Sequence, residues 1–227
     1  MHTLELALPF LIVLFPIADL FLEKHKFNSK SAEYVKSAAM LWAVTGFLLY
    51  CFFEGSLSVA SPQVLPTVSW KGWSAIALFV VFIAYLVFVI ISMRKNPDVR
   101  KQVLDAFNKG GDSLNDILPS SWKEYMLFTA LVSVSAGLCE ELIFRWYVFN
   151  FIDVHAHWAV ALVVSSLLFG IWHLYLGWQH VIKSAVVGAL LCGLYIYTES
   201  ILIVIVAHIL MDIYSGTVAI FARQKHT

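Results

Sequence analysis

The chain has 227 residues, of which 60% are hydrophobic and only 13% are charged, and its mean hydropathy is +0.80. Soluble domains carry about 25% charged residues, so this composition excludes a water-soluble enzyme and a disordered chain. Fifteen Lys and Arg balance fifteen Asp and Glu. This leaves no basic excess to neutralise phosphates, and no nucleic-acid partner is expected. The composition therefore predicts a polytopic membrane protein.

Seven apolar runs have about the ~20 residues that a helix needs to cross a bilayer. They cover residues 4–22, 38–60, 73–93, 124–150, 157–176, 179–198 and 200–221. Their continuity argues against a transmembrane barrel, whose strands are short and alternate in polarity. We predict an all-α protein with about seven transmembrane helices. Cys51, Cys139 and Cys192 lie inside these runs and are expected to pack as small apolar residues.

The basic residues support this number of spans and indicate an orientation. Thirteen of the fifteen Lys and Arg fall in odd-numbered connections or the C-terminal tail, one falls in an even-numbered connection, and Arg145 is left inside the fourth run. Cytoplasmic loops of membrane proteins carry an excess of Lys and Arg. We therefore expect a chain in the cytoplasmic (inner) membrane, with its N-terminus outside and its C-terminus in the cytoplasm.

One long polar segment, residues 94–121, divides the chain. Val99, Val103 and Phe107 recur in it at helical spacing, which predicts a short amphipathic helix over 98–108 on the cytoplasmic surface. The three runs before this segment contain few polar residues, and the four runs after it contain many.

Ionisable residues inside a membrane span cost about 2.5–3.5 kcal/mol each on insertion scales, which makes them candidate functional residues. The last four runs hold a dense set of them: Glu140, Glu141, Arg145, His173, His208 and Asp212. Glu141 and Arg145 are four residues apart, share a helix face and can form an ion pair. Glu140 points ~100° away from that face. One turn also separates Phe169 from His173, and His208 from Asp212.

Three helices thus each present an acid or an imidazole on one face. Because polar groups in lipid must find one another or water, we expect these faces to meet at a common wet cavity. A carboxylate there can take a proton from water, and an imidazole can donate to a developing oxyanion. The same groups, Glu140, His173 and His208, are also possible zinc ligands, although the His-Glu-x-x-His pattern of many zinc proteases is absent.

The three motifs read Glu140-Glu141-Leu-Ile-Phe-Arg145, Phe169-Gly-Ile-Trp-His173 and His208-Ile-Leu-Met-Asp212. In this order, and within spans, they resemble the motifs of the CPBP family of intramembrane proteases, which includes CAAX-processing endopeptidases and bacterial Abi proteins. The resemblance covers about residues 120–222 and implies a conical cavity open to the membrane. It divides the chain into variable N-terminal spans with a cytoplasmic linker (1–120), a catalytic core (121–222) and a cytoplasmic tail (223–227).

The resemblance also implies roles for the site residues. Glu140 and His173 would activate a water for attack on a peptide carbonyl, and His208 with residue 212 would stabilise the oxyanion. Eukaryotic CAAX proteases carry Asn at this last position, whereas this chain carries Asp212, which in its ionised form cannot donate to an oxyanion. We therefore expect Asp212 to orient His208.

The remaining motif residues are expected to support the site. Glu141 and Arg145 would form a structural ion pair that holds Glu140 in place, and Phe169 would be a packing residue. No cofactor is expected.

The resulting prediction is an endopeptidase that cleaves a membrane-tethered protein or peptide near its C-terminus. One alternative is a zinc-dependent protease of the same fold, with Glu140, His173 and His208 as ligands. Another is a non-catalytic immunity or regulatory protein, or a transporter, although no inverted repeat of the kind found in many transporters is visible. The sequence does not specify the substrate.

The depth of two site residues conflicts with straight, upright spans. Glu140 lies roughly 24 Å from the cytoplasmic end of its run, and His173 lies roughly 24 Å from the outer end of its own. A fourth helix that begins near Ala130 and tilts would bring them into one layer. Asp19, near the end of the first run, is expected to face solvent.

Overall fold

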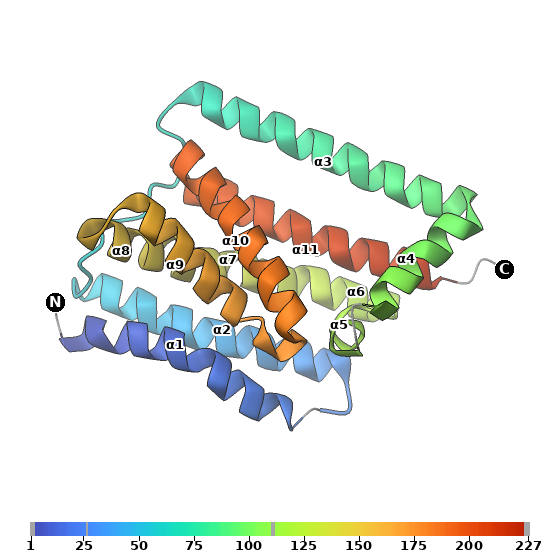
Figure 1. Ribbon diagram of the computed structural model, residues 1–227, viewed down its shortest axis with the longest axis horizontal. Coiled ribbons are helices and arrows are strands. Elements are labelled where there is room, and N and C mark those ends of the chain that lie inside the picture. Colours follow the sequence, from blue (N-terminus) through green and yellow to red (C-terminus); the bar gives the residue numbers. More distant parts are fainter. Residues whose placement is uncertain (1–2, 26, 110–111, 225–227) are drawn as a thin grey trace.

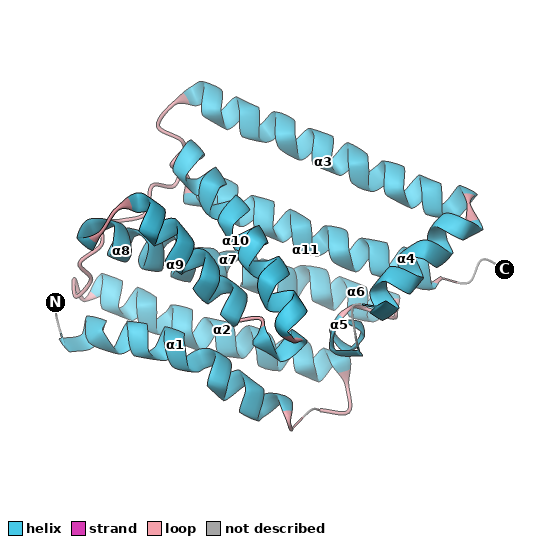
Figure 2. Cartoon of the chain, in the orientation of Figure 1, coloured by secondary structure: helices cyan, strands magenta, loops and turns pink. Residues whose placement is uncertain are grey.

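The computed structural model describes residues 3–25, 27–109 and 112–224, and these residues form helices and short connections without a strand (Figure 2). The predicted all-α fold is therefore confirmed. Lys26 and Lys225 of the charge count, and residues 225–227 of the predicted tail, lie outside the described residues. The helical segments are α1 (Thr3–Glu23), α2 (Lys30–Phe53), α3 (Ser69–Lys95), α4 (Pro97–Lys109), α5 (Asp112–Ile117), α6 (Trp122–Leu127), η1 (Phe128–Ser133), α7 (Val134–Glu141), η2 (Leu142–Phe149), α8 (Asn150–His155), α9 (Trp158–Ile171), η3 (Leu174–Leu176), α10 (Trp178–Thr198) and α11 (Ile201–Arg223).

The long helices run side by side along the long direction of the molecule (Figure 1). α1 forms one edge and α3 the other. Between them, α2 packs on α7, α7 packs on α11, and α11 packs on α3. α9 and α10 cross this row obliquely. The start of α1 and the end of α11 lie at opposite ends of the bundle. α7, which carries Glu140 and Glu141, is therefore in the middle of the protein.

Six helices of the described chain are long and apolar enough to cross a membrane, and they confirm a polytopic membrane protein. They cover Leu4–Glu23, Lys30–Phe53, Ser69–Lys95, Trp122–His155, Trp178–Thr198 and Ile201–Arg223. The fifth predicted span, 157–176, is corrected: α9 has only 14 residues and is followed by a tight turn.

Close packing explains why α9 ends early. A Cβ added at Gly170 would lie 2.5 Å from the carbonyl oxygen of Val181, so α9 meets the start of α10 backbone to backbone. The chain reverses between the two helices through Gly177, whose φ of +95° favours glycine. His173 is consequently held at the tip of a helical hairpin, rather than within a span.

This hairpin resolves the conflict in depth. The helical segments from Trp122 to His155 follow one another without a break, so the predicted start near Ala130 is wrong. Glu140 lies 15 residues before the α8–α9 turn at His155, and His173 lies 16 residues after His157. Because α9 folds back along η2 and α8, the two side chains lie at similar distances from that turn.

The predicted amphipathic helix is confirmed as α4. Its apolar residues, Val99, Val103 and Phe107, pack together with a cluster formed by Met93 of α3 and two residues of α11. The apolar face of α4 is therefore covered at least in part by protein.

A proline anchors α1 to the rest of the bundle. Pro16 has no N–H, so the carbonyl of Ile12 four residues earlier loses its partner within the helix. The indole Nε1 of Trp172 donates to that carbonyl at 2.8 Å, and the Trp172 ring stacks on Phe15 with centroids 4.0 Å apart. α1 is thereby fixed next to the turn that carries His173.

The three cysteines are buried and unpaired, as predicted.

Candidate active site

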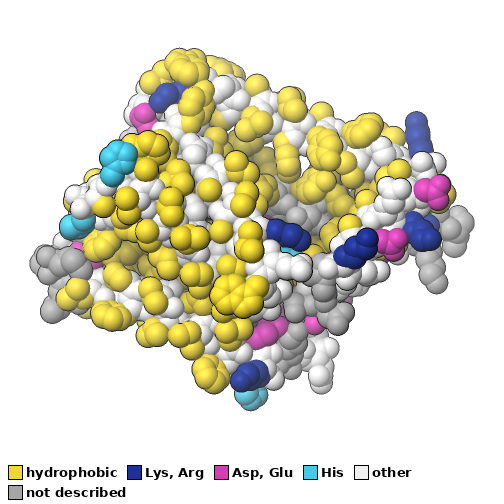
Figure 3. All heavy atoms as spheres, in the orientation of Figure 1, with side chains coloured by type: hydrophobic (Ala, Val, Ile, Leu, Met, Phe, Trp, Pro, Cys, Tyr) yellow, Lys and Arg dark blue, Asp and Glu magenta, His cyan; other side chains and the backbone are white. Residues whose placement is uncertain are grey.

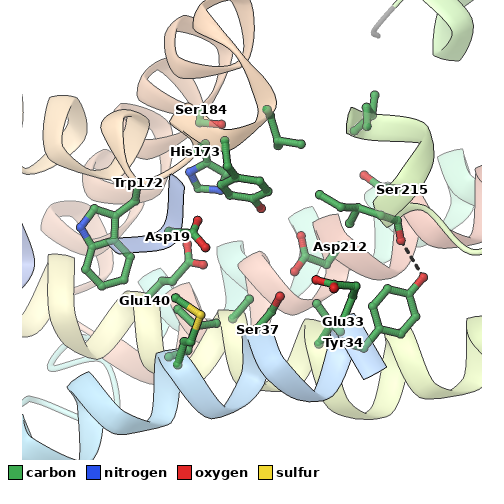
Figure 4. Close-up of a pocket in the computed structure, with 18 of the residues that line it drawn as sticks. Asp19, Glu33, Tyr34, Ser37, Glu140, Trp172, His173, Ser184, Asp212 and Ser215 are labelled. Carbon is green, nitrogen blue, oxygen red and sulfur yellow. Dashed lines mark hydrogen bonds between the residues drawn. The ribbon is translucent and has the colours of Figure 1, made fainter. Parts of the chain in front are cut away.

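A cavity of about 370 Å³ joins the polar residues of the three motifs. Glu140 of α7, His173 of the α9–α10 turn, and His208 and Asp212 of α11 all line it. Figure 4 shows Glu140, His173 and Asp212 around one open space. The three motifs, which are separated in sequence, therefore meet at one cavity, as the sequence predicts.

Glu140 offers a carboxylate oxygen with no partner. The residue is 7% exposed, and its Oε2 atom is buried without a hydrogen bond among the described residues. Ala136, one turn earlier, lines the same cavity, so this face of α7 points into it. An unpartnered buried carboxylate oxygen is costly unless water or a ligand reaches it. The position is suited to binding a water molecule.

Glu141 forms the centre of a second cluster of buried polar groups. Its Oε2 lies 3.1 Å from Nε of Arg145, and both side chains are completely buried, so the predicted ion pair is confirmed. Its Oε1 lies 2.6 Å from Nδ1 of His208 on α11. The carboxylate thus links two helices and fixes the imidazole ring.

This contact corrects the partner expected for His208. Nε2 of His208 lies 4.0 Å from Oδ2 of Asp212, which is too long for a hydrogen bond. Glu141, 67 residues away in sequence, makes the contact that was expected of Asp212. The i, i+4 spacing within α11 indicated the nearest acid, but the inter-helix packing decided which acid the ring meets.

His173 is fixed by its own helix. Its Nδ1 lies 2.9 Å from the carbonyl oxygen of Phe169, and the two rings are 5.0 Å apart. A carbonyl can only accept, so Nδ1 carries the hydrogen. In the neutral ring, Nε2 is then a lone-pair acceptor.

Phe169 packs among the polar groups, in agreement with a packing role. Its ring lies 4.4 Å from the Arg145 guanidinium carbon and 5.8 Å from the His208 ring. Nη2 of Arg145 donates to the Gly188 carbonyl at 3.1 Å. A Cβ at Gly188 would lie 3.0 Å from the Phe169 ring, so glycine permits this close approach.

The N-terminal half supplies cavity residues that the motifs did not indicate. Asp19 of α1 lies beside Glu140 in Figure 4, and Tyr34 and Ser37 of α2 also line the cavity. Asp19 is partly buried, and was expected to face solvent at the end of its run. Its distance in sequence from the motifs hid this position, and the anchoring of α1 at Trp172 explains it.

The zinc alternative finds no donor set in the described part of the chain. There, no group of three or more His, Cys, Asp or Glu side chains is placed to hold a metal ion. The set Glu140, His173 and His208 therefore does not fit a metal ion in this arrangement.

Comparison with protein families shows a similarity over the second half of the chain. Residues 122–214 match the family model described as Type II CAAX prenyl endopeptidase Rce1-like. Searches of the curated proteins and of the solved structures found no match. The matched segment includes all three motifs and every motif residue of the cavity. Residues 122–214 of this chain are therefore similar to the Rce1-like family.

Proposed function

We propose that the protein is an intramembrane endopeptidase that hydrolyses a peptide bond near the C-terminus of a membrane-associated protein or peptide. The Rce1-like match supports a protease of the CAAX type at the level of the family. One observation carries the proposal: the unpartnered Oε2 of Glu140 and the orientated ring of His173 line the same cavity.

Glu140 and His173 activate the water. A water molecule bound between them gives a proton to the Glu140 carboxylate or to Nε2 of His173, and its oxygen attacks the peptide carbonyl carbon. The tetrahedral intermediate then collapses, the C–N bond breaks, and the same proton passes to the leaving amine. The products are a new carboxylate on the substrate and a free C-terminal fragment.

His208 stabilises the oxyanion. Nδ1–H donates to Glu141, which fixes the ring, and Nε2 remains available toward the cavity. With both nitrogens protonated, Nε2–H donates to the carbonyl oxygen as negative charge develops on it. Arg145 balances the charge of Glu141, so the positive charge of the doubly protonated His208 ring is left to face the oxyanion.

The substrate reaches the site from the cytoplasmic side of the inner membrane. Besides the motif residues, the cavity is lined by Leu114, Ile117 and Leu118, which belong to the connection between α4 and α6. This connection lies within the stretch 94–123, which holds the largest group of basic residues in the chain, and loops with such an excess are cytoplasmic.

The test uses the full chain in phosphatidylcholine liposomes and a fluorogenic peptide with an S-farnesyl cysteine at the fourth position from its C-terminus. Glu140→Gln retains the shape of the side chain and removes the base, so kcat should fall about 10²–10⁴-fold. Glu54→Gln is the matched control, because Glu54 is exposed and lies outside the cavity, and its rate should be unchanged. Wild-type turnover by the Glu140→Gln chain would overturn the mechanism.

Two further measurements separate the alternatives. Loss of activity with 1,10-phenanthroline, together with stoichiometric zinc in the purified protein, would support the zinc-dependent protease. If neither the peptide nor any precursor in the membrane proteome is processed, and the cellular phenotype survives Glu140→Gln with His173→Ala, the protein is non-catalytic.

A further inference from the structure

Lys183 is a cavity residue that the proposed mechanism does not use. It lies near the start of α10, and Lys183, Ser184 and Val187 all line the cavity. The neighbouring face of α10 points outward, since Ile182 and Val186 are 67% and 57% exposed. Lys183 is therefore on the side of the helix that faces the site.

Most of the charged residues that line the cavity are acidic, and Lys183 is one of the few basic ones. Its acidic lining residues are Asp19, Glu23, Glu33, Asp116, Glu140 and Asp212. The basic lining residues are Lys36 and Lys183. Lys36 is paired with Glu33 on its own helix. For Lys183, the described part of the chain shows neither an ion pair nor a hydrogen bond, and its side chain is exposed.

Figure 3 shows that the face of the molecule turned to the viewer is mostly hydrophobic and is hollowed near its middle, where basic side chains reach the surface. Because Lys183 is exposed and lines the cavity, its ammonium group, which has three donors, can reach a ligand there. Ser184, the next residue, lies beside His173 in Figure 4 and adds a hydroxyl donor.

An acidic cavity repels an anionic ligand unless a cation receives the charge. A peptide cut near its C-terminus brings one obligatory anion, its α-carboxylate, into the same space as Glu140 and Asp212. We propose that Lys183 binds this α-carboxylate. This inference rests on the proposed function and adds the group that selects the C-terminus.

A lipid phosphate is the other anion that a lysine near the membrane surface can bind. The two anions are separated by changing only the peptide. A carboxylate site discriminates between a peptide acid and the same peptide with a C-terminal carboxamide, whereas a lysine engaged by lipid does not.

The experiment compares these two peptides, both S-farnesylated, on the full chain in phosphatidylcholine liposomes. The wild type should cleave the acid with a KM about tenfold below that of the amide, because a charge-assisted hydrogen bond is lost in the amide. Lys183→Gln should remove this preference by raising KM for the acid, with kcat little changed. Lys183→Arg should keep the preference, and Lys101→Gln, an exposed lysine on α4 outside the cavity, should match the wild type.

Direct binding keeps this inference separate from the proposed function. Glu140→Gln should bind the acid about tenfold more tightly than the amide without cutting either, as measured by fluorescence anisotropy. Equal affinities, or a preference that survives Lys183→Gln, would overturn the inference even if cleavage proceeds as proposed. If Lys183→Gln weakens the binding of both peptides to the same extent, Lys183 instead binds lipid or has a structural role. Acid-selective binding with no cleavage in the wild type would count against the proposed function alone.

Discussion

α3 and the long helix from Trp122 to His155 are both apolar and long enough to cross a membrane, but they occupy opposite environments. Only 6% of the most apolar window of α3 is buried within the protein, against 56% for the long helix. α3 contains no Asp, Glu, Lys, Arg or His between Lys71 and Arg94, whereas the long helix carries Glu140, Glu141 and Arg145.

This difference shows which kind of residue is stabilised by moving from lipid into the helix bundle. Lipid is as apolar as a leucine side chain, so an apolar residue gains little by moving from lipid into the bundle. A charged residue gains much by leaving lipid for a partner. The more polar helix is therefore in the interior and the more apolar one at the edge, which reverses the arrangement of a soluble protein.

Breaking the buried ion pair should give the largest loss of stability. Arg145→Met leaves the Glu141 carboxylate in the core with its cation removed, and we expect a loss of about 3–5 kcal/mol in the free energy of unfolding. Unfolding by SDS titration in mixed micelles measures it. Glu141→Gln with Arg145→Met should recover part of the loss, because neither charge then remains. A single variant as stable as the wild type would mean that the pair contributes nothing.

A pair of isoleucines tests the two environments directly. Ile143 of η2 is fully buried and Ile83 of α3 is 46% exposed. Ile143→Ala leaves a cavity in packed protein and should cost about 3 kcal/mol, whereas Ile83→Ala should cost well under 1 kcal/mol because lipid fills the space. Similar losses in the same SDS titration would contradict the contrast between the two helices.

The partner of His208 can be tested by activity. Glu141→Gln removes the carboxylate that fixes the His208 ring, so kcat should fall about 100-fold with little change in KM, which is about 2.7 kcal/mol of transition-state stabilisation. Asp212→Asn should change kcat less, because Asp212 makes no hydrogen bond to the ring. Rates are normalised to the folded fraction. A larger loss in Asp212→Asn would return the orienting role to Asp212.

An ion pair outside the spans should have the smallest effect. Glu199, between α10 and α11, accepts hydrogen bonds from Thr67 and Lys71, and these hold the pKa of Glu199 below its ordinary value. A lowered folded-state pKa stabilises the protein above the unfolded pKa of about 4.3, and this contribution disappears as pH falls through the folded value. Lys71→Gln should therefore lower the melting temperature slightly at pH 7 and not at pH values well below 4. A loss that is independent of pH would point to packing of the lysine stem instead.

Sequence patterns with a short range predicted much of the site. The four-residue spacing of Glu141 and Arg145 predicted their contact, because helix geometry alone brings such positions together. The length of the apolar runs predicted the helical fold. The cost of charge in lipid identified four residues that line the cavity, namely Glu140, His173, His208 and Asp212, since such groups have to meet.

Contacts between distant segments could not be read in this way. Gly170 packs against the backbone at Val181 and ends α9 early, which places His173 at a hairpin tip, whereas apolar composition alone indicated a full span. Likewise, Asp19 reaches the cavity because α1 is anchored at Trp172. Neither feature is marked by a pattern among neighbouring residues of the sequence.

By itself, the sequence determined that this is a helical membrane protein with one group of polar residues inside it, because the energies of apolar and charged groups in lipid depend on each residue alone. The tertiary structure decided which acid holds His208, how deep His173 lies, and that Lys183 lines the acidic cavity with no partner among the residues that the structure describes. Those outcomes depend on how helices pack, and packing is set by the shapes of side chains that are far apart in the chain.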